Sequence, residues 1–216
     1  PYVLGMLSEL GRDLYYPKGI LTQTAEAKQK ANRCNATIGI AKESGQAMHL
    51  NSVMRQFANV TPDEVFPYAP SPGRPDLRAK WKELLVEKNP SLKGKQISLP
   101  VVTNGITHAI SMFGDIWLNP DDVVVLPEMM WGNYNMILGL RKAARTRSYP
   151  IFTSDGAFNV PAFEAAVKDE ARKNKKITVL LNFPHNPTGY TATQKEGKQI
   201  VDILTDIAKS GNHVLV

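Results

Sequence analysis

The chain has 216 residues, of which 43% are hydrophobic and 21% charged, a composition typical of a globular protein and not of a disordered segment. No apolar run approaches the ~20 residues that a membrane-spanning helix needs, so no membrane segment is predicted. The net charge of +6 comes from scattered lysines and arginines, which favours small anionic ligands over nucleic acid. One cysteine, Cys34, excludes an internal disulfide and a metal site built from several thiolates; it fits a reducing, cytoplasmic compartment.

The first third of the chain shows little periodicity. We expect residues 1–23 to form an irregular arm, residues 24–32 a short polar helix, and residues 35–50 irregular or short-strand structure. Five prolines lie between Pro62 and Pro75, and proline is excluded from helix interiors and central strands. This stretch is therefore expected to be a stiff, exposed loop, and such loops often carry functional side chains.

From residue 77 onward, helix-like and strand-like patterns alternate. Helical spacing of apolar residues occurs over 77–88, 106–117, 132–143, 161–167 and 193–207, whereas apolar runs at 101–102, 123–126, 145–152, 177–181 and 214–216 predict strands. Thr193 and Glu196 have capping-box spacing at the start of the last helix. The alternation predicts an α/β fold, with a mostly parallel sheet sandwiched by helices.

A turn at residues 103–107 joins a predicted strand to a predicted helix. Such a turn presents free backbone N–H groups and the positive end of the helix, which together bind anions. Gly105 permits a positive φ or the close approach of a ligand, and Thr107 adds a hydroxyl. Taken alone, the pattern favours a plain strand-to-helix turn capped by Asn or Thr. The chain contains neither a P-loop motif nor the glycine-rich dinucleotide motif, so neither kind of site is predicted.

A second motif, Asn182-Phe-Pro-His-Asn-Pro-Thr-Gly189, directly follows the predicted strand 177–181. Ligands of open parallel sheets bind beyond the carboxyl ends of the strands, where an Asn amide offers two donors and an acceptor. A cis Asn186–Pro187 bond, which costs only ~0.5–1 kcal/mol, would aim the Asn186 side chain over the sheet. Because Asn-Pro and Thr-Gly are common turn formers, the motif alone also allows a plain turn.

The octapeptide 182–189 resembles the N-x-P-x-N-P-T-G signature of class I/II aminotransferases, which are fold type I enzymes that use pyridoxal 5′-phosphate (PLP). Other segments resemble the family in the same order along the chain. Residues 103–107 are similar to its phosphate cup, and Trp131-Gly-Asn133 to its cofactor-stacking aromatic segment. Tyr68-x-Pro-x-x-Gly73 is similar to its cross-subunit tyrosine loop. The resemblance spans about residues 35–216, which a chance octapeptide would not do.

The resemblance implies which residues bind PLP. Gly105, Ile106 and Thr107 would hold its phosphate. Trp131 would cover one face of its ring, although more residues separate this Trp from the preceding proline than in the aspartate enzymes. Asn186 would donate a hydrogen bond to the O3′ oxygen, and a bond of this kind to a charged acceptor contributes ~1.5–3 kcal/mol.

The resemblance also implies roles for residues outside these motifs. Tyr68 would donate a hydrogen bond to the cofactor phosphate of the neighbouring subunit in a homodimer. Gly39 and Asn186 would lie at the substrate. His185 is expected to be a structural histidine at the surface, Cys34 has no expected role, and no metal is implied.

In this family the Schiff-base lysine, the aspartate at the pyridine nitrogen and the arginine for the substrate carboxylate come later in the sequence. We therefore expect no catalytic residue within residues 1–216, Lys195 and Lys198 included. Residues 1–45 would be an N-terminal arm with a segment of the small domain, and residues 46–216 an incomplete PLP-binding large domain. The resemblance implies the N-terminal portion of a cytoplasmic, homodimeric aminotransferase, inactive alone, whose parent moves an amino group from an amino acid to a 2-oxo acid.

Two alternatives remain at this point. One is an aminotransferase-like sensor domain of a transcription regulator, which would bind PLP without catalysis, although no helix-turn-helix segment is visible. The other is a different fold type I PLP enzyme, such as a lyase or synthase acting on an amino acid. The sequence does not name the amino acid substrate.

Overall fold

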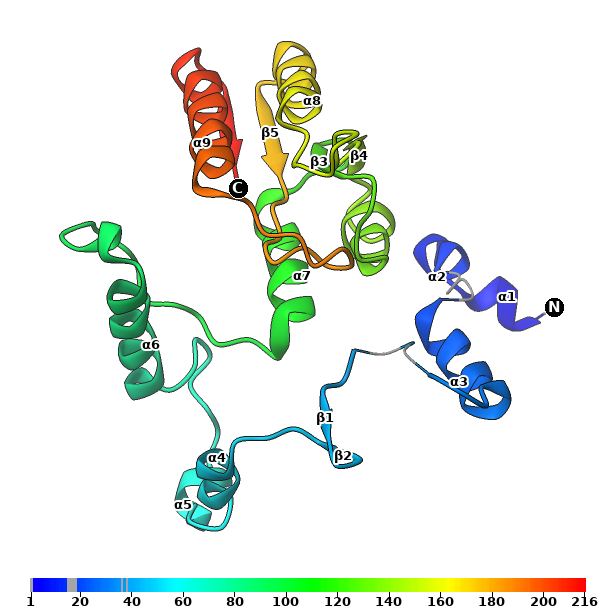
Figure 1. Ribbon diagram of the computed structural model, residues 1–216, viewed down its shortest axis with the longest axis vertical. Coiled ribbons are helices and arrows are strands. Elements are labelled where there is room, and N and C mark those ends of the chain that lie inside the picture. Colours follow the sequence, from blue (N-terminus) through cyan, green and yellow to red (C-terminus); the bar gives the residue numbers. More distant parts are fainter. Residues whose placement is uncertain (1, 15–18, 36, 38) are drawn as a thin grey trace. The chain divides into compact units, whose positions relative to one another are not determined.

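The computed structural model describes residues 2–14, 19–35, 37 and 39–216 (Figure 1). The chain divides into two compact units. The first, here called the sheet unit, comprises residues 1–15 and 106–216; the second, here called the helical unit, comprises residues 16–105. The predicted boundary at residue 45 between an arm and a large domain stays a prediction.

A four-stranded parallel sheet, in the order β4-β3-β5-β6, forms the centre of the sheet unit. The strands are β3 (Val123–Pro127), β4 (Arg145–Tyr149), β5 (Lys176–Val179) and β6 (His213–Leu215). Each falls on or within a residue of a predicted run, and β3 is buried at every position, as expected for a strand covered on both faces. The predicted α/β fold with a parallel sheet is confirmed.

Helices cover both faces of this sheet. The side chains of β3 alternate between two apolar clusters. Val123 and Val125 pack with α8 (Val160–Lys173) and α9 (Gln194–Lys209). Val124 and Leu126 pack on the other face with the π-helical segment η2 (Asn135–Leu140) and with Ile110 of α7 (Gly105–Trp117). All four β3 side chains are at most 1% exposed.

Local signals set the starts of α8 and α9. The Asn159 side chain accepts a hydrogen bond from the Ala162 N–H, and a proline lies in the first turn of α8. At α9 the predicted capping box is present, with Thr193 and Glu196 each accepting from the other's backbone N–H. Both devices satisfy N–H groups that the first turn of a helix leaves without partners.

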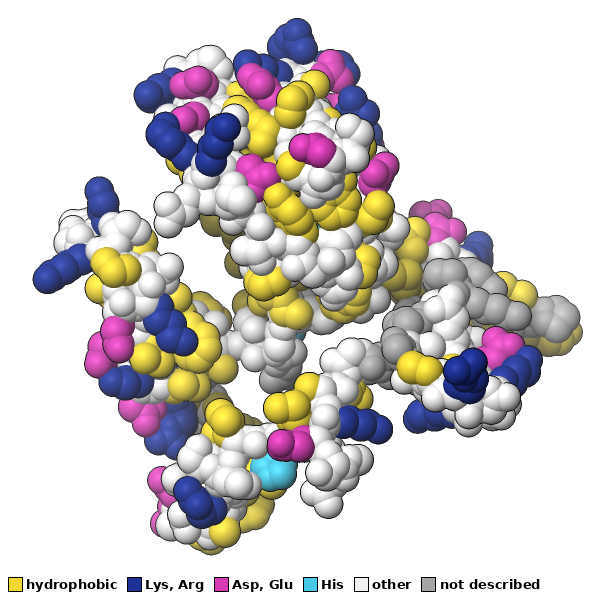
Figure 2. Space-filling view, viewed as in Figure 1, with side chains coloured by type: hydrophobic (Ala, Val, Ile, Leu, Met, Phe, Trp, Pro, Cys, Tyr) yellow, Lys and Arg dark blue, Asp and Glu magenta, His cyan; other side chains and the backbone are white. Residues whose placement is uncertain are grey.

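The helical unit consists of short elements: α3 (Ile20–Lys30), the hairpin β1 (Lys42–Glu43) and β2 (Gln46–Ala47), α4 (Asn51–Gln56), α5 (Pro62–Val65), α6 (Pro75–Lys88) and the 3-10 turn η1 (Pro90–Leu92). Among its described side-chain positions, only Thr24 and Gly73 are buried. Figure 2 shows hydrophobic side chains at the surface of this unit. Phe57, Phe66 and Tyr68 are among the large hydrophobic residues that are exposed.

Several predictions for the first 105 residues are corrected. Over the described residues, the expected arm contains α1 (Tyr2–Met6), α2 (Glu9–Asp13) and the start of α3. The proline-rich stretch includes α5, because Pro62 occupies a first turn, where no N–H is needed. Residues 101–102 form no strand; the Val102 N–H donates to Pro72 O, in a loop. Residues 1, 15–18, 36 and 38 of the predicted segments lie outside the described residues.

Helices α1 to α9 and η2, as far as they are described, include none that is long and apolar enough to cross a membrane.

Candidate active site

The carboxyl ends of β3 and β5 lie side by side, because these parallel strands are paired directly, Val124 with Thr178 and Val125 with Val179. The segment after β3, residues 128–134, carries Trp131 and is here called the β3 loop. The segment after β5, residues 182–190, carries the octapeptide and is here called the signature loop. Strand pairing thus brings the two loops to one edge of the sheet, which is where open α/β sheets bind ligands.

Tyr134 connects these two loops. Its hydroxyl accepts a hydrogen bond from Asn182 Nδ2 at 3.4 Å, and its ring meets the Trp131 ring edge-on, with the centroids 5.5 Å apart. Tyr134 is buried, whereas Trp131 is half-buried and keeps part of its surface open. Burial raises the pKa of the Tyr134 hydroxyl, while the Asn182 bond acts in the opposite direction, so the phenol is neutral at physiological pH.

The signature loop is held by its own hydrogen bonds. The His185 N–H donates to Tyr190 O at 2.7 Å, and the Gly189 N–H donates to His185 O at 2.6 Å. His185 Nδ1 lies 2.8 Å from Thr188 Oγ1. The Asn186–Pro187 peptide bond is cis, the form that the sequence left open.

The predicted surface position of His185 is wrong: its side chain is buried, because the loop closes over the ring and supplies a partner for Nδ1. Burial lowers the pKa of this imidazole, and a hydrogen bond with the Met129 backbone opposes part of that shift. Met129 belongs to the β3 loop, so His185 provides a second link between the two loops.

A buried carboxylate supports the end of the signature loop. Glu196 Oε1 accepts hydrogen bonds from Tyr190 Oη at 2.7 Å and from the Phe158 N–H at 3.0 Å. Glu196 Oε2 accepts from the Thr193 N–H and hydroxyl at 2.7 and 2.8 Å. Burial alone would raise the pKa of Glu196, but these hydrogen bonds outweigh it and lower the pKa to about 2. The group is therefore a carboxylate at neutral pH.

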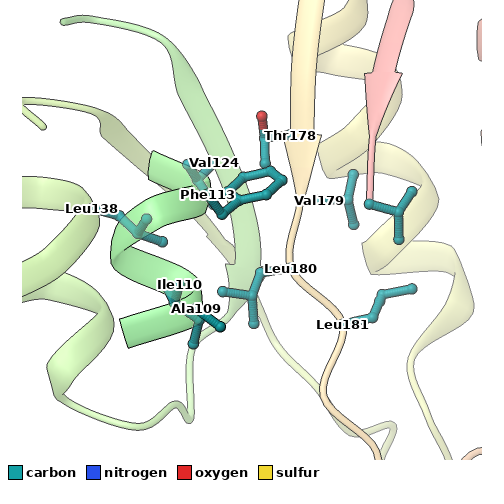
Figure 3. Close-up of a pocket in the computed structure, with 10 residues that line it drawn as sticks. Ala109, Ile110, Phe113, Val124, Leu138, Thr178, Val179, Leu180 and Leu181 are labelled. Atoms are coloured by element: carbon teal, nitrogen blue, oxygen red, sulfur yellow. The ribbon is translucent and has the colours of Figure 1, made fainter. Parts of the chain in front are cut away.

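The first turn of α7 reaches the same edge of the sheet. Figure 3 shows Ala109 and Ile110 of α7 beside Leu180, which directly follows β5. Ile106 and Thr107, one turn earlier, are exposed. The first N–H groups of a helix have no intrahelical partner, so this end of α7 can bind an anion. Gly105 has a φ of +78°, and a Cβ there would meet nothing within 4 Å, which leaves room for a ligand.

The predicted residues therefore fall into two groups. Trp131 and the exposed Asn186 lie on loops at the edge of the sheet unit, where α7 begins. Tyr68 and Gly39 are exposed residues of the helical unit. Sequence reasoning missed Tyr134, although its i, i+3 spacing from Trp131 on a helical turn is a usable signal. It also missed the hydrogen bonds that Glu196 accepts from Tyr190 and Phe158, outside its own capping box.

An apolar cavity of about 290 Å³ lies between α7 and strands β3 and β5 (Figure 3). Phe113 and Leu138 line it, and so does Thr178, whose buried hydroxyl has no hydrogen-bond partner among the described residues. None of the residues predicted to bind PLP lines this cavity, and its one polar side chain cannot hold a phosphate. We therefore assign it to packing and not to the site. No three described His, Cys, Asp or Glu side chains cluster as metal ligands would.

Comparison with known proteins decides the family. The sequence matches the family described as aminotransferase class I and II over residues 37–216. The chain belongs to this family. The family implies PLP as cofactor, and the parallel sheet flanked by helices is the fold type I architecture of aspartate-aminotransferase-like proteins.

Individual relatives show how much of the chain is matched. The Bacillus subtilis (strain 168) protein named "Probable N-acetyl-LL-diaminopimelate aminotransferase" is 28% identical over 142 residues, 66% of this chain and 34% of that protein. The aspartate aminotransferase of Bacillus sp. (strain YM-2) is 26% identical over 205 residues, 93% of this chain and 48% of that protein. The solved aminotransferase from Anaerococcus prevotii DSM 20548 superimposes with a TM-score of 0.82 at 23% identity, covering 97% of this chain and 52% of that one. The chain thus spans about half, or less, of the length of the relatives it matches.

Proposed function

We propose that this chain is part of a PLP-dependent aminotransferase that moves an amino group from an amino acid to a 2-oxo acid. The observation that carries the proposal is the meeting of Trp131 and the signature loop at one edge of the parallel sheet, in a chain of this family. When bound, PLP supplies an electron-withdrawing ring for the chemistry at the amino group, and the protein supplies binding and orientation.

The groups at this edge fit the parts of PLP. The N-terminus of α7, with Gly105, Ile106 and Thr107, offers N–H donors and the positive end of a helix dipole to the phosphate. Trp131 offers an aromatic face with open surface to the ring. Asn186 offers an exposed amide donor to O3′, and through the same side chain it would contact the substrate.

We further propose a homodimer in which Tyr68 donates to the cofactor phosphate of the second subunit, and Gly39 lies at the substrate carboxylate. The Tyr68 side chain is fully exposed, and the large apolar side chains near it in the sequence are more than half exposed, so this surface is suited to burial against another chain. We keep the division into residues 1–45 and 46–216 and a cytoplasmic location as part of this proposal.

The catalytic lysine is proposed to lie outside residues 1–216. Lys195 and Lys198 are exposed on α9, and Lys198 forms an ion pair with Asp202 at 2.5 Å. Both therefore belong to the helix surface, and neither is proposed as the catalytic lysine. The role of this portion of the protein is therefore to bind and orient the cofactor, and residues 1–216 alone are expected to be inactive.

The test is to purify the full-length protein, measure PLP binding by visible absorbance, and follow product formation from amino acid donors with 2-oxoglutarate as acceptor. We expect bound PLP and turnover that depends on both substrates. Bound PLP without turnover of any donor would instead indicate a sensor domain. Turnover that needs no 2-oxo acid would indicate a lyase or synthase, and no PLP binding would overturn the proposal.

A further inference from the structure

We propose that Tyr134 is a positioning residue that couples the ring of Trp131 to the head of the signature loop and so sets the orientation of the bound cofactor. The inference rests on the proposed function, because Trp131 and Asn186 are the residues proposed to contact PLP from these two loops. Tyr134 itself is not proposed to touch the cofactor.

The first part of the argument is that Tyr134 holds Trp131 by two separate contacts. The Tyr134 N–H donates to Trp131 O at 3.0 Å, which closes a backbone turn between them. The two rings then meet edge-on at 88° with centroids 5.5 Å apart, a favoured geometry for aromatic pairs. With backbone and ring both engaged, the Trp131 indole has little freedom to tilt.

The second part is that the Tyr134 hydroxyl acts on a different loop. It accepts from Asn182 Nδ2 at 3.4 Å, and Asn182 is the first residue of the signature loop. Asn182 is part-buried and Tyr134 is 6% exposed, so breaking this bond would leave a buried polar atom without its partner. The ring and the hydroxyl of one side chain therefore contact two different loops of the candidate site.

The third part is that Tyr134 is itself fixed. It precedes η2 and belongs to the apolar cluster that includes Ile137, Leu138 and the β3 residues Val124 and Leu126. A side chain packed in the core moves little and therefore restrains the groups that it contacts, whereas an exposed side chain would not. The contact of His185 with the Met129 backbone joins the same two loops at another point, which is consistent with loops that act as one body.

The experiment compares variants of the full-length protein that separate the effect of the Tyr134 hydroxyl from that of its ring. Tyr134→Phe removes the hydroxyl and keeps the ring, whereas Tyr134→Leu removes both. Asn182→Ala removes the same hydrogen bond from the other side and serves if a Tyr134 variant does not fold. Tyr149→Phe is the matched control, because Tyr149 is also a buried tyrosine but packs against Phe158 and Phe163 in the other apolar cluster.

The readouts are the dissociation constant for PLP and the visible circular dichroism of the cofactor at saturating PLP, with thermal unfolding measured alongside. Loss of one long hydrogen bond is expected to raise the dissociation constant about threefold to tenfold in Tyr134→Phe and Asn182→Ala. A double variant that combines Tyr134→Phe with Asn182→Ala is expected to bind PLP as tightly as the weaker-binding single variant, because both substitutions remove the same hydrogen bond. Tyr134→Leu is expected to change the circular dichroism most, and Tyr149→Phe not at all.

Each outcome decides something. If the wild-type protein binds PLP but Tyr134→Phe and Asn182→Ala match it in dissociation constant and circular dichroism, the coupling role is wrong while the proposed function stands. Additive effects in the double variant would also overturn the coupling. A shift in thermal stability with an unchanged circular dichroism at saturation would reduce Tyr134 to a packing residue. Failure of the wild-type protein to bind PLP would count against the proposed function itself.

Discussion

The Tyr190 hydroxyl donates a 2.7 Å hydrogen bond to Glu196 Oε1. Tyr190 is the residue directly after the octapeptide, and Glu196 lies in the first turn of α9. The same carboxylate oxygen accepts from the Phe158 N–H, just before α8. One side chain therefore ties the end of the signature loop to the starts of both helices that cover this face of the sheet.

This arrangement predicts a pH-dependent contribution to stability from Glu196. Its pKa is about 2 in the folded protein against an ordinary value of 4.5, so the folded state favours the carboxylate. The contribution is fully present above about pH 4.5 and is lost as the pH falls toward 2. Glu196→Gln is expected to lower the free energy of unfolding by ~1–3 kcal/mol at pH 7. Denaturant unfolding at a series of pH values measures this difference.

The difference between Glu196→Gln and wild type is expected to shrink as the pH is lowered, because a protonated Glu resembles Gln. Glu164→Gln is the control, since Glu164 forms only an i, i+4 ion pair with Lys168 on the surface of α8, and such pairs contribute ~0.5 kcal/mol or less. A difference for Glu196→Gln that does not change between pH 7 and pH 3.5 would contradict the assignment.

Asn186→Ala is expected to change the absorbance of bound PLP in the full-length protein. An amide that donates to O3′ favours the deprotonated oxygen, so its loss should raise the pH at which the cofactor absorbance titrates. The measurement is a spectrophotometric pH titration. Asn119→Ala is the matched control, because Asn119 is an exposed Asn in the turn before β3, at the opposite edge of the sheet. An unchanged spectrum and titration for Asn186→Ala would remove this residue from the site.

Tyr68→Phe is expected to weaken PLP retention in the full-length protein without unfolding it. The side chain is fully exposed, so loss of its hydroxyl should cost the chain's own fold nothing, whereas a charge-assisted bond to a phosphate would be lost. Retention is measured by dialysis against buffer without PLP, and oligomeric state by light scattering. Tyr2→Phe, another highly exposed tyrosine, is the control. A monomer with full PLP occupancy would argue against the shared site.

Gly73→Ala is expected to disturb the loop that carries Tyr68. Gly73 has a φ of +96°, and a Cβ there would lie 2.2 Å from Val102 Cγ2, so the loop must move. Gly94→Ala is the control for backbone strain, because Gly94 has a φ of +78° but open space around the added Cβ. Comparing the two variants therefore separates the clash with Val102 from the strain of a positive φ. The backbone strain is then similar in the two variants. PLP retention should fall in Gly73→Ala and not in Gly94→Ala. Equal PLP retention in the two variants would show that PLP binding does not depend on the position of the Tyr68 loop.

The parts predicted well from the sequence are those set by near neighbours along the chain. The apolar run 123–126 and the stripe Ile200, Ile203, Leu204, Ile207 are buried as expected, because burial on both faces of a strand or one face of a helix leaves a periodic pattern. The Thr193–Glu196 capping box is likewise local. Family membership was also predictable, because the octapeptide is contiguous.

The failures lie where the structure depends on distant partners. Residues 101–102 have the composition of a strand, but they pair with no other strand among the described residues. A strand is formed by hydrogen bonds to a neighbouring strand, so composition alone does not produce one. His185 looks like a surface residue until the loop closes over it. Tyr134 owes its place in the site to Asn182, which strand pairing brings beside it.

The sequence by itself therefore determined the α/β class and the α9 capping box, because both depend on patterns among residues close together along the chain. The candidate cofactor residues follow from the family resemblance and stay predictions. Only the tertiary structure decided which of those residues meet. Parallel pairing of β3 with β5 places two separate loops at one edge, and a buried phenol and a buried carboxylate then fix them there. The physical reason is that a hydrogen bond depends on the distance between two atoms in space, and strand pairing sets that distance for residues far apart along the chain.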